Sequence, residues 1–185
     1  MEINENAIRD IVTNILKDNS NDVPTGSNSF AIIPGVFDDI NKAIYEARKA
    51  HKVFTNTSLE IRRAMIQAMR QVVEDNAEQF ARLAVEETGM GRFEDKIRKN
   101  LLAGRKTPGV EDLGPSSFSD DHGLTITERA SYGVIGAIAP STNPTETIIN
   151  NSISMVSAGN TVVFNSHPGA KNVSVFAIKL LNEAI

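Results

Sequence analysis

Two short polar segments carry side chains that could contact a nucleotide or a reacting carbonyl group. Each segment follows an apolar run and precedes a stretch with helical periodicity. Backbone N–H groups at a helix N-terminus favour phosphate or a developing oxyanion. Polar residues at such places can also serve only to cap the helix, so both interpretations stay open. The first segment is Pro140, Ser141, Thr142 and Asn143, and the second is Asn165, Ser166, His167 and Pro168.

The residue types disfavour several other kinds of site. The 185 residues include no cysteine, which excludes a disulfide, a thiolate metal site or a cysteine nucleophile formed from them. The sequence has neither a G-x-G-x-x-G nor a P-loop fingerprint, and it has no G-x-S-x-G elbow. His51 and His122 have no second ligand at metal-binding spacing, so no metal site is predicted. A small hydrolase that uses Ser and His is left open by composition alone.

Composition also bears on partners. A net charge of −4, 5% aromatic residues and the absence of Trp argue against nucleic-acid binding, which requires basic clusters and stacking side chains. No apolar run approaches the roughly 18–20 residues of a membrane span. The first ten residues are acidic and amide-rich where a secretory signal would be basic and then apolar, which disfavours export by that route.

The two polar segments would meet if the runs before them were parallel neighbours in a sheet. Residues 133–140 are a continuous run of small apolar residues, typical of a strand buried on both faces, and residues 161–164 predict a second strand. Helical patterns cover residues 144–158 and 170–185. We therefore predict an α/β fold with a strand-helix-strand-helix unit, in which both polar segments lie at carboxyl ends of strands.

Helical patterns dominate the chain before this unit. Asp38 and Asp39 are predicted to cap a first helix and Ser58 a second. A third helix is predicted over residues 77–88 with Gly89 as its stop, and a fourth over residues 93–102. Residues 106–123 predict an irregular connection, and the alternation over residues 124–132 predicts an edge or hairpin strand.

The N-terminal residues predict a tethered helix. Residues 2–18 place apolar side chains along one helical face, and residues 18–29 consist almost entirely of Asn, Ser, Asp, Gly, Thr and Pro, as in a flexible linker. Such a helix could pack on its own domain. The flexible linker favours a recognition helix that docks on a partner instead.

Ten motifs, in a match that runs in order from about Phe37 to Ile185, resemble the N-terminal part of the CoA-acylating aldehyde dehydrogenases. The resemblance is greatest to the propionaldehyde and acetaldehyde dehydrogenases of bacterial microcompartments. Two of the motifs, P-S-T-N-P at Pro140–Pro144 and H-P at His167–Pro168, distinguish the acylating branch from ordinary members of the family. The motifs are Glu87–Arg92, Glu94–Lys96, Lys99–Asn100, Thr107–Glu111, Gly123–Thr125, Tyr132–Val134, Pro140–Pro144, Ile149–Asn151, Ala158–Asn160 and His167–Pro168.

The resemblance implies three parts of the chain: a targeting helix over 1–18, a flexible linker over 19–36, and over 37–185 the first βαβα part of a Rossmann-like domain that binds NAD and coenzyme A. It implies NAD-dependent oxidation of a short, propionaldehyde-like aldehyde to acyl-CoA in a bacterial microcompartment lumen. Homo-oligomers and a shell protein bound by residues 2–18 are the implied partners. The implied cofactor-binding residues are Pro140, Ser141, Thr142, Asn165, Ser166, His167 and Pro168.

The resemblance also suggests residues for the chemistry. Ordinary family members supply an oxyanion donor from the Asn of a P-W-N-F-P loop. Alignment of the prolines puts Thr142 at that place and Asn143 one residue later, so both are candidates. The ribose-binding Lys of a K-P-x-E loop is replaced, and His167 with the backbone is expected to line the adenosine pocket.

The nucleophilic Cys of the family is absent from these residues, and the chain ends at Ile185 within a helical pattern without a C-cap. We therefore expect an N-terminal piece that is inactive alone. The alternative is a non-enzymatic nucleotide-binding or assembly module with a docking helix.

Overall fold

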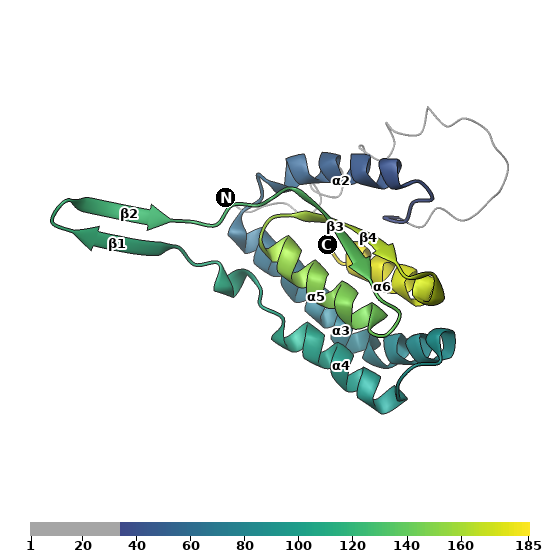
Figure 1. Ribbon diagram of the computed structural model, residues 1–185. Helices are drawn as coiled ribbons and strands as arrows, with labels where there is room; N and C mark the ends of the chain where they lie inside the picture. The colour runs from purple at the N-terminus through teal and green to yellow at the C-terminus, as the bar shows by residue number, and fades with distance from the viewer. Residues whose placement is uncertain (1–33) are drawn as a thin grey trace, which may run out of the picture. The chain divides into compact units, whose positions relative to one another are not determined.

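The computed structural model describes residues 34–185. The helix predicted over residues 2–18 and most of the predicted linker 19–36 lie outside the described residues. In the described part no helix is long and apolar enough to span a membrane. The elements are α2 (Ile40–Phe54), α3 (Leu59–Thr88), α4 (Phe93–Lys106), η2 (Val110–Asp112), β1 (Ser116–Asp120), β2 (Gly123–Thr127), β3 (Val134–Ala139), α5 (Pro144–Ser157), β4 (Thr161–Ser166), η3 (Pro168–Ala170) and α6 (Lys171–Glu183), as Figure 1 shows.

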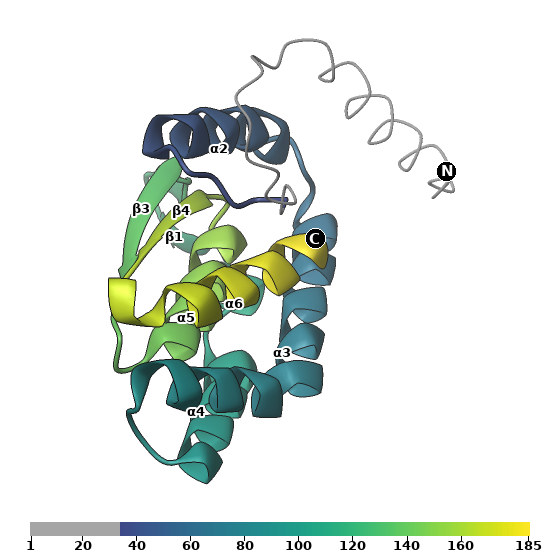
Figure 2. The same ribbon diagram turned by 90° about the vertical axis from the view of Figure 1, so that its right-hand side faces the viewer.

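The predicted strand-helix-strand-helix unit is confirmed, and with it the α/β fold class. β3 and β4 are parallel neighbours, in a register that runs from Val134 opposite Thr161 to Ala139 opposite Ser166. α5 connects them and packs on them with α6, while α2 lies along the strands on the other side (Figures 1 and 2). β4 continues through Ser166, two residues beyond the predicted strand, because the ladder to β3 extends that far.

The prediction that the first strand is buried on both faces is wrong for the carboxyl half of β3. Ala137 and Ala139 are buried on the side of α5, whereas Gly136 is exposed and Ile138 is 80% exposed. A strand alternates its side chains between two faces, so full burial requires a cover on each. Within residues 34–185 only the face toward α5 is covered along the whole strand.

The capping predictions for Asp39 and Ser58 are confirmed, whereas Asp38 precedes the N-cap of α2. The Asp39 side chain accepts a hydrogen bond from Asn41 N, and Ser58 accepts one from Ile61 N. The two separate helices predicted between Ser58 and Gly89 are instead one helix of 30 residues, α3, which Gly89 ends with a left-handed φ of 66°. No Gly or Pro interrupts residues 59–88, so the polar residues 74–76 remain helical.

The connection predicted over residues 106–123 contains a strand. β1 pairs with β2 in an antiparallel hairpin, from Ser116 opposite Thr127 to Asp120 opposite Gly123. The low strand propensity of S-S-F-S-D hid β1, since pairing with β2 rather than local preference stabilises it. The strand predicted over 124–132 is confirmed only as far as Thr127. All ten residues of the hairpin are exposed, and Figure 1 shows it extending away from the helices.

The core lies where α3, α5 and α6 meet beneath the parallel strands (Figure 2). Its largest fully buried apolar side chains are Phe80, Met69, Ile148, Ile149, Ile153, Val73 and Val173. α4 lies against α3 at a close approach, because a Cβ on Gly104 would stand 2.8 Å from Val73 Cγ1. Nearby, Arg105 donates two hydrogen bonds of 2.6 Å to the Glu74 carboxylate, and this contact lowers the pKa of Glu74 from its ordinary value.

We expect Gly104→Ala to lower the free energy of unfolding by about 1–3 kcal/mol, because the new methyl group overpacks the contact between α3 and α4. In the Val73→Ala background the same substitution should cost less, since two methyl groups have been removed beside it. Urea denaturation of the four proteins in this cycle measures the difference. Equal costs in both backgrounds would contradict the close approach.

Candidate functional site

The parallel pairing brings the two predicted polar segments to one edge of the sheet. Ala139 and Ser166 are paired at the ends of their strands, and His167 N donates to Ala139 O at 2.9 Å, so the two loops leave the sheet side by side. Of the eight predicted residues, Ser141, Asn143 and Ser166 are partly buried and the other five are exposed. Asn165 and Ser166 lie at the end of β4 rather than in the loop after it.

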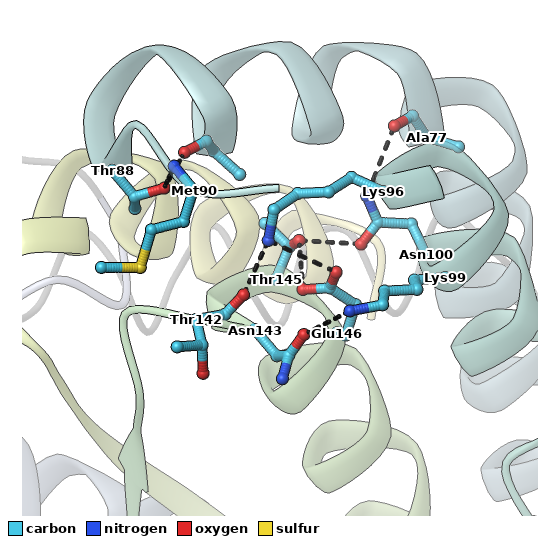
Figure 3. A network of polar contacts seen from close by, with 11 residues as sticks. Ala77, Thr88, Met90, Lys96, Lys99, Asn100, Thr142, Asn143, Thr145 and Glu146 are labelled. Atoms are coloured by element: carbon cyan, nitrogen blue, oxygen red, sulfur yellow. Dashed lines mark hydrogen bonds and ion pairs between the residues drawn. The ribbon is translucent and has the colours of Figure 1, made fainter. Parts of the chain in front are cut away.

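The first loop, Pro140–Asn143, is held by two lysines of α4. Lys96 Nζ donates a 2.7 Å hydrogen bond to the backbone carbonyl of Thr142, and Lys99 Nζ donates a 2.9 Å hydrogen bond to Asn143 Oδ1 (Figure 3). The Lys96 side chain is only 3% exposed, and its ammonium lies 3.8 Å from Glu146 Oε1. A buried ammonium requires such partners to stay charged. The loop therefore meets a fixed positive charge on its inner side.

A buried polar network supports this loop from below. The Thr145 hydroxyl lies 2.7 Å from Asn100 Oδ1 and 3.2 Å from Glu146 Oε2. Asn100 Nδ2 reaches back to the carbonyl of Ala77 at 3.4 Å. Figure 3 shows these groups between α3, α4 and the first turn of α5. The network joins three helices behind the loop, which limits its freedom to shift.

The turn between α3 and α4 is shaped around Lys96. Gly91 has a left-handed φ of 82°, and a Cβ on it would lie 3.1 Å from Lys96 Cε. Thr88 Oγ1 accepts a hydrogen bond from Met90 N and donates one to Ala84 O. From the sequence, the G-M-G segment Gly89–Gly91 carries only a helix-stop prediction, at Gly89. The structure shows that its second glycine also leaves room for the lysine stem.

The second loop differs because a carboxylate already lies at the helix that follows it. Glu87 Oε1 accepts from Asn172 N at 2.8 Å, and Glu87 Oε2 accepts from Val173 N at 2.7 Å. These are first-turn N–H groups of α6, which are the groups that would bind phosphate. Anion binding, predicted as one possibility at both helices, is therefore disfavoured at α6. The first N–H groups of α6 are capped by Glu87 of α3, and not by a residue of the second loop as the capping interpretation expects.

His167 contributes one ring nitrogen to the local turn. Its Nδ1 accepts a 3.0 Å hydrogen bond from Gly169 N and so caps η3. A neutral imidazole with Nδ1 as acceptor carries its proton on Nε2. The exposed His167 thus presents Nε2–H as a donor at the sheet edge.

By contrast, α5 begins without a side-chain cap. Asn143 makes no capping hydrogen bond, and Pro144 stands in the first turn without an N–H of its own. A groove of about 490 Å³ starts at Asn143 and Glu146 and runs between α4 and α5, with Lys99, Lys106 and Asn150 in its wall. Residues 165–168 take no part in it. The groove therefore borders the first loop and not the second.

Several residues of this site were not predicted to have a role, among them Glu87, Lys96, Lys99 and Asn100. Each acts on a partner far along the chain, such as Thr142 for Lys96, so local spacing carries no signal for the contact. Their presence in the quoted motifs was the only indication. Among residues 34–185 no cluster of His, Cys, Asp and Glu fits a metal ion, and no metal was predicted.

Comparison with known proteins places the chain among dehydrogenases. The model of the aldehyde dehydrogenase family matches residues 24–185. An acetylating acetaldehyde dehydrogenase of Salmonella typhimurium is 48% identical over 151 residues, which cover 82% of this chain and 32% of that protein. The chain spans about a third to two fifths of the length of the curated relatives it matches best.

Three solved structures are similar. A propionaldehyde dehydrogenase from a Clostridium phytofermentans fucose utilisation microcompartment has a TM-score of 0.79 and 52% identity, covering 81% of this chain and 34% of that one. A Rhodopseudomonas palustris propionaldehyde dehydrogenase with bound CoA and an acylated Cys has a TM-score of 0.79 and 49% identity, covering 81% and 35%. An engineered glycolyl-CoA reductase with bound NADP+ has a TM-score of 0.80 and 46% identity, covering 83% and 36%.

We expect Glu87→Gln to lower the free energy of unfolding by about 1–2 kcal/mol, because a neutral amide keeps one acceptor but loses the second and the charge at the start of α6. The matched control is Glu86→Gln, which removes the same charge from an exposed neighbour. Thermal unfolding at pH 7 compares the two. Equal losses would mean that the carboxylate at α6 contributes nothing specific.

Proposed function

The chain belongs to the aldehyde dehydrogenase family, and on that premise we propose that it is the N-terminal part of an NAD-dependent dehydrogenase that oxidises a short aldehyde, such as propionaldehyde, to its acyl-CoA. The observation that carries the proposal is the pair of loops at one sheet edge, held by residues of the motifs shared with the acylating branch. The names of the relatives favour an enzyme over a non-enzymatic assembly module.

The reaction needs a thiolate, a hydride acceptor and an acyl acceptor. The thiolate belongs to a Cys outside these residues; its addition to the aldehyde carbon forms a thiohemiacetal with negative charge on oxygen. When bound, NAD would supply the acceptor for the hydride, and coenzyme A would supply the thiol that receives the acyl group from the thioester and so frees the thiolate. The part of this chain is to bind the nucleotides and to stabilise the oxyanion.

The two loops divide these tasks in the proposal. The second loop binds adenosine, since His167 offers Nε2–H at an exposed edge and the α6 N-terminus is already occupied by Glu87. NAD and coenzyme A use this pocket in turn, because both carry an adenosine. The first loop supplies the oxyanion donor, from the Thr142 hydroxyl or the Asn143 amide, beside the groove between α4 and α5.

The full-length protein tests the reaction. With propionaldehyde we expect NADH formation, followed by absorbance, that depends on added coenzyme A and yields propionyl-CoA in equal amount. Residues 1–185 alone should show none under the same conditions. NADH formation with free propionate as the product would overturn the acylating assignment, and turnover by residues 1–185 would overturn the assignment of the thiolate to a Cys outside them.

We extend the proposal to partners and location. The complete enzyme is a homo-oligomer in a bacterial microcompartment lumen. The exposed Phe118, Leu124 and Ile126 of the hairpin suit a contact between copies, and light scattering of the full-length protein checks that state. Residues 2–18 bind a shell protein, because their apolar side chains at helical spacing suit a helix-in-groove contact.

We expect Ile11→Asp with Ile15→Asp to abolish co-purification of the full-length protein with shells, since a charge on the apolar face cannot enter a hydrophobic groove. Asn14→Asp, on the opposite face, is the matched control and should co-purify normally. Quantitative immunoblotting of purified shells measures both. Co-purification of the Ile11→Asp, Ile15→Asp variant with shells at the normal level would contradict the docking role of residues 2–18.

A further inference from the structure

Two lysines three residues apart on α4 contact successive residues of the first loop. Lys96 reaches the backbone carbonyl of Thr142, and Lys99 reaches the side chain of Asn143. Residues three apart share one face of a helix, so a rigid element presents both ammonium groups at once. Figure 3 shows them on the same side of α4, above the loop.

The contact to Lys99 decides how the Asn143 amide is oriented. A side-chain amide has one oxygen, which accepts, and one NH2 group, which donates. With Oδ1 engaged by Lys99, Nδ2 is directed to the other side, as Figure 3 shows. Asn143 therefore presents a donor whose direction is set before any substrate binds.

The contact to Lys96 sets the backbone in the same way. No cis peptide bond occurs in the described part of the chain, and in a trans peptide the C=O and the following N–H point in opposite directions. Since the Thr142 carbonyl points to Lys96, the Asn143 N–H points away from it. The backbone and side-chain donors of Asn143 are thus both fixed by α4.

The Thr142 hydroxyl has no comparable support. Its residue is exposed, and the hydroxyl has no hydrogen-bond partner among residues 34–185. A hydroxyl that rotates freely has to be ordered when charge develops, which weakens its stabilisation of an oxyanion.

We propose that Lys96 and Lys99 are positioning residues that hold the first loop so that Asn143, and not Thr142, supplies the oxyanion donors. The inference rests on the proposed function. It goes further by choosing between the two candidates and by assigning roles to two residues of α4.

Lys96 needs a variant that separates positioning from folding. Its removal would leave the carboxylate of Glu146 buried beside an empty place, and such an unpaired charge destabilises a protein. Lys96→Met is therefore combined with Glu146→Gln, which removes both charges together. Thermal unfolding of the double variant confirms that it folds.

The experiment measures kcat and KM of the full-length protein in the CoA-acylating assay. Asn143→Ala should lower kcat about 10²–10³-fold, whereas Thr142→Val should change it less than about threefold. The Lys96→Met, Glu146→Gln double variant should lower kcat about 10²-fold and leave the KM for NAD within about threefold. Arg98→Met, an exposed cation on the same helix, is the matched control and should leave kcat unchanged.

A double-mutant cycle tests whether Lys99 acts through Asn143. Lys99→Met alone should lower kcat about tenfold, Lys99→Arg should restore most of that loss, and Lys99→Met should add less than about twofold in the Asn143→Ala background. The inference would be overturned if the kcat losses of Lys99→Met and Asn143→Ala multiplied in the double variant. A larger kcat loss in Thr142→Val than in Asn143→Ala would overturn it too, as would full kcat in the Lys96→Met, Glu146→Gln double variant. If the unsubstituted protein lacks CoA-dependent turnover, the proposed function fails first and the inference with it.

Discussion

A single buried ammonium group sets the requirements for much of the structure around the first loop. Lys96 lies on α4 with 3% of its side chain exposed, and charge in such a place is tolerated only with close partners. The Thr142 carbonyl and the Glu146 carboxylate are those partners, which ties α4 to α5 and to the carboxyl end of β3. Gly91 leaves space for the same side chain, because a Cβ at that position would press on the aliphatic stem of Lys96.

The two loops at the sheet edge show how similar sequence features acquire different physics. Both are polar, both contain proline and both precede a helix. At the second loop, Glu87 fills the N-terminus of α6 and cancels its positive end. At the first loop, the positive charge of Lys96 lies on the inner side, and α5 begins without a side-chain cap. The start of α6 is therefore already neutralised by a carboxylate, whereas the start of α5 has no such partner.

The sequence predicted what depends on local pattern. Apolar runs and helical spacing located the parallel pair, its crossover and the two loops, and the capping residues Asp39 and Ser58 acted as predicted. It failed where a distant partner decides the outcome. β1 exists because β2 pairs with it, and Lys96 is buried because a loop 46 residues later accepts its hydrogen bond. In both cases the residues next to β1 or Lys96 in the sequence do not indicate the distant partner.

That separation along the chain has a consequence for the order of folding. α3 and α4 are neighbours in sequence, joined by a short turn, so their contact closes only a small loop, which favours its early formation. The hydrogen bonds from Lys96 and Lys99 span 46 and 44 residues, and those from Asn172 and Val173 to Glu87 span 85 and 86. We therefore expect the helical hairpin to form before the strand-helix-strand unit docks on it, and both loops to reach their native geometry late in folding.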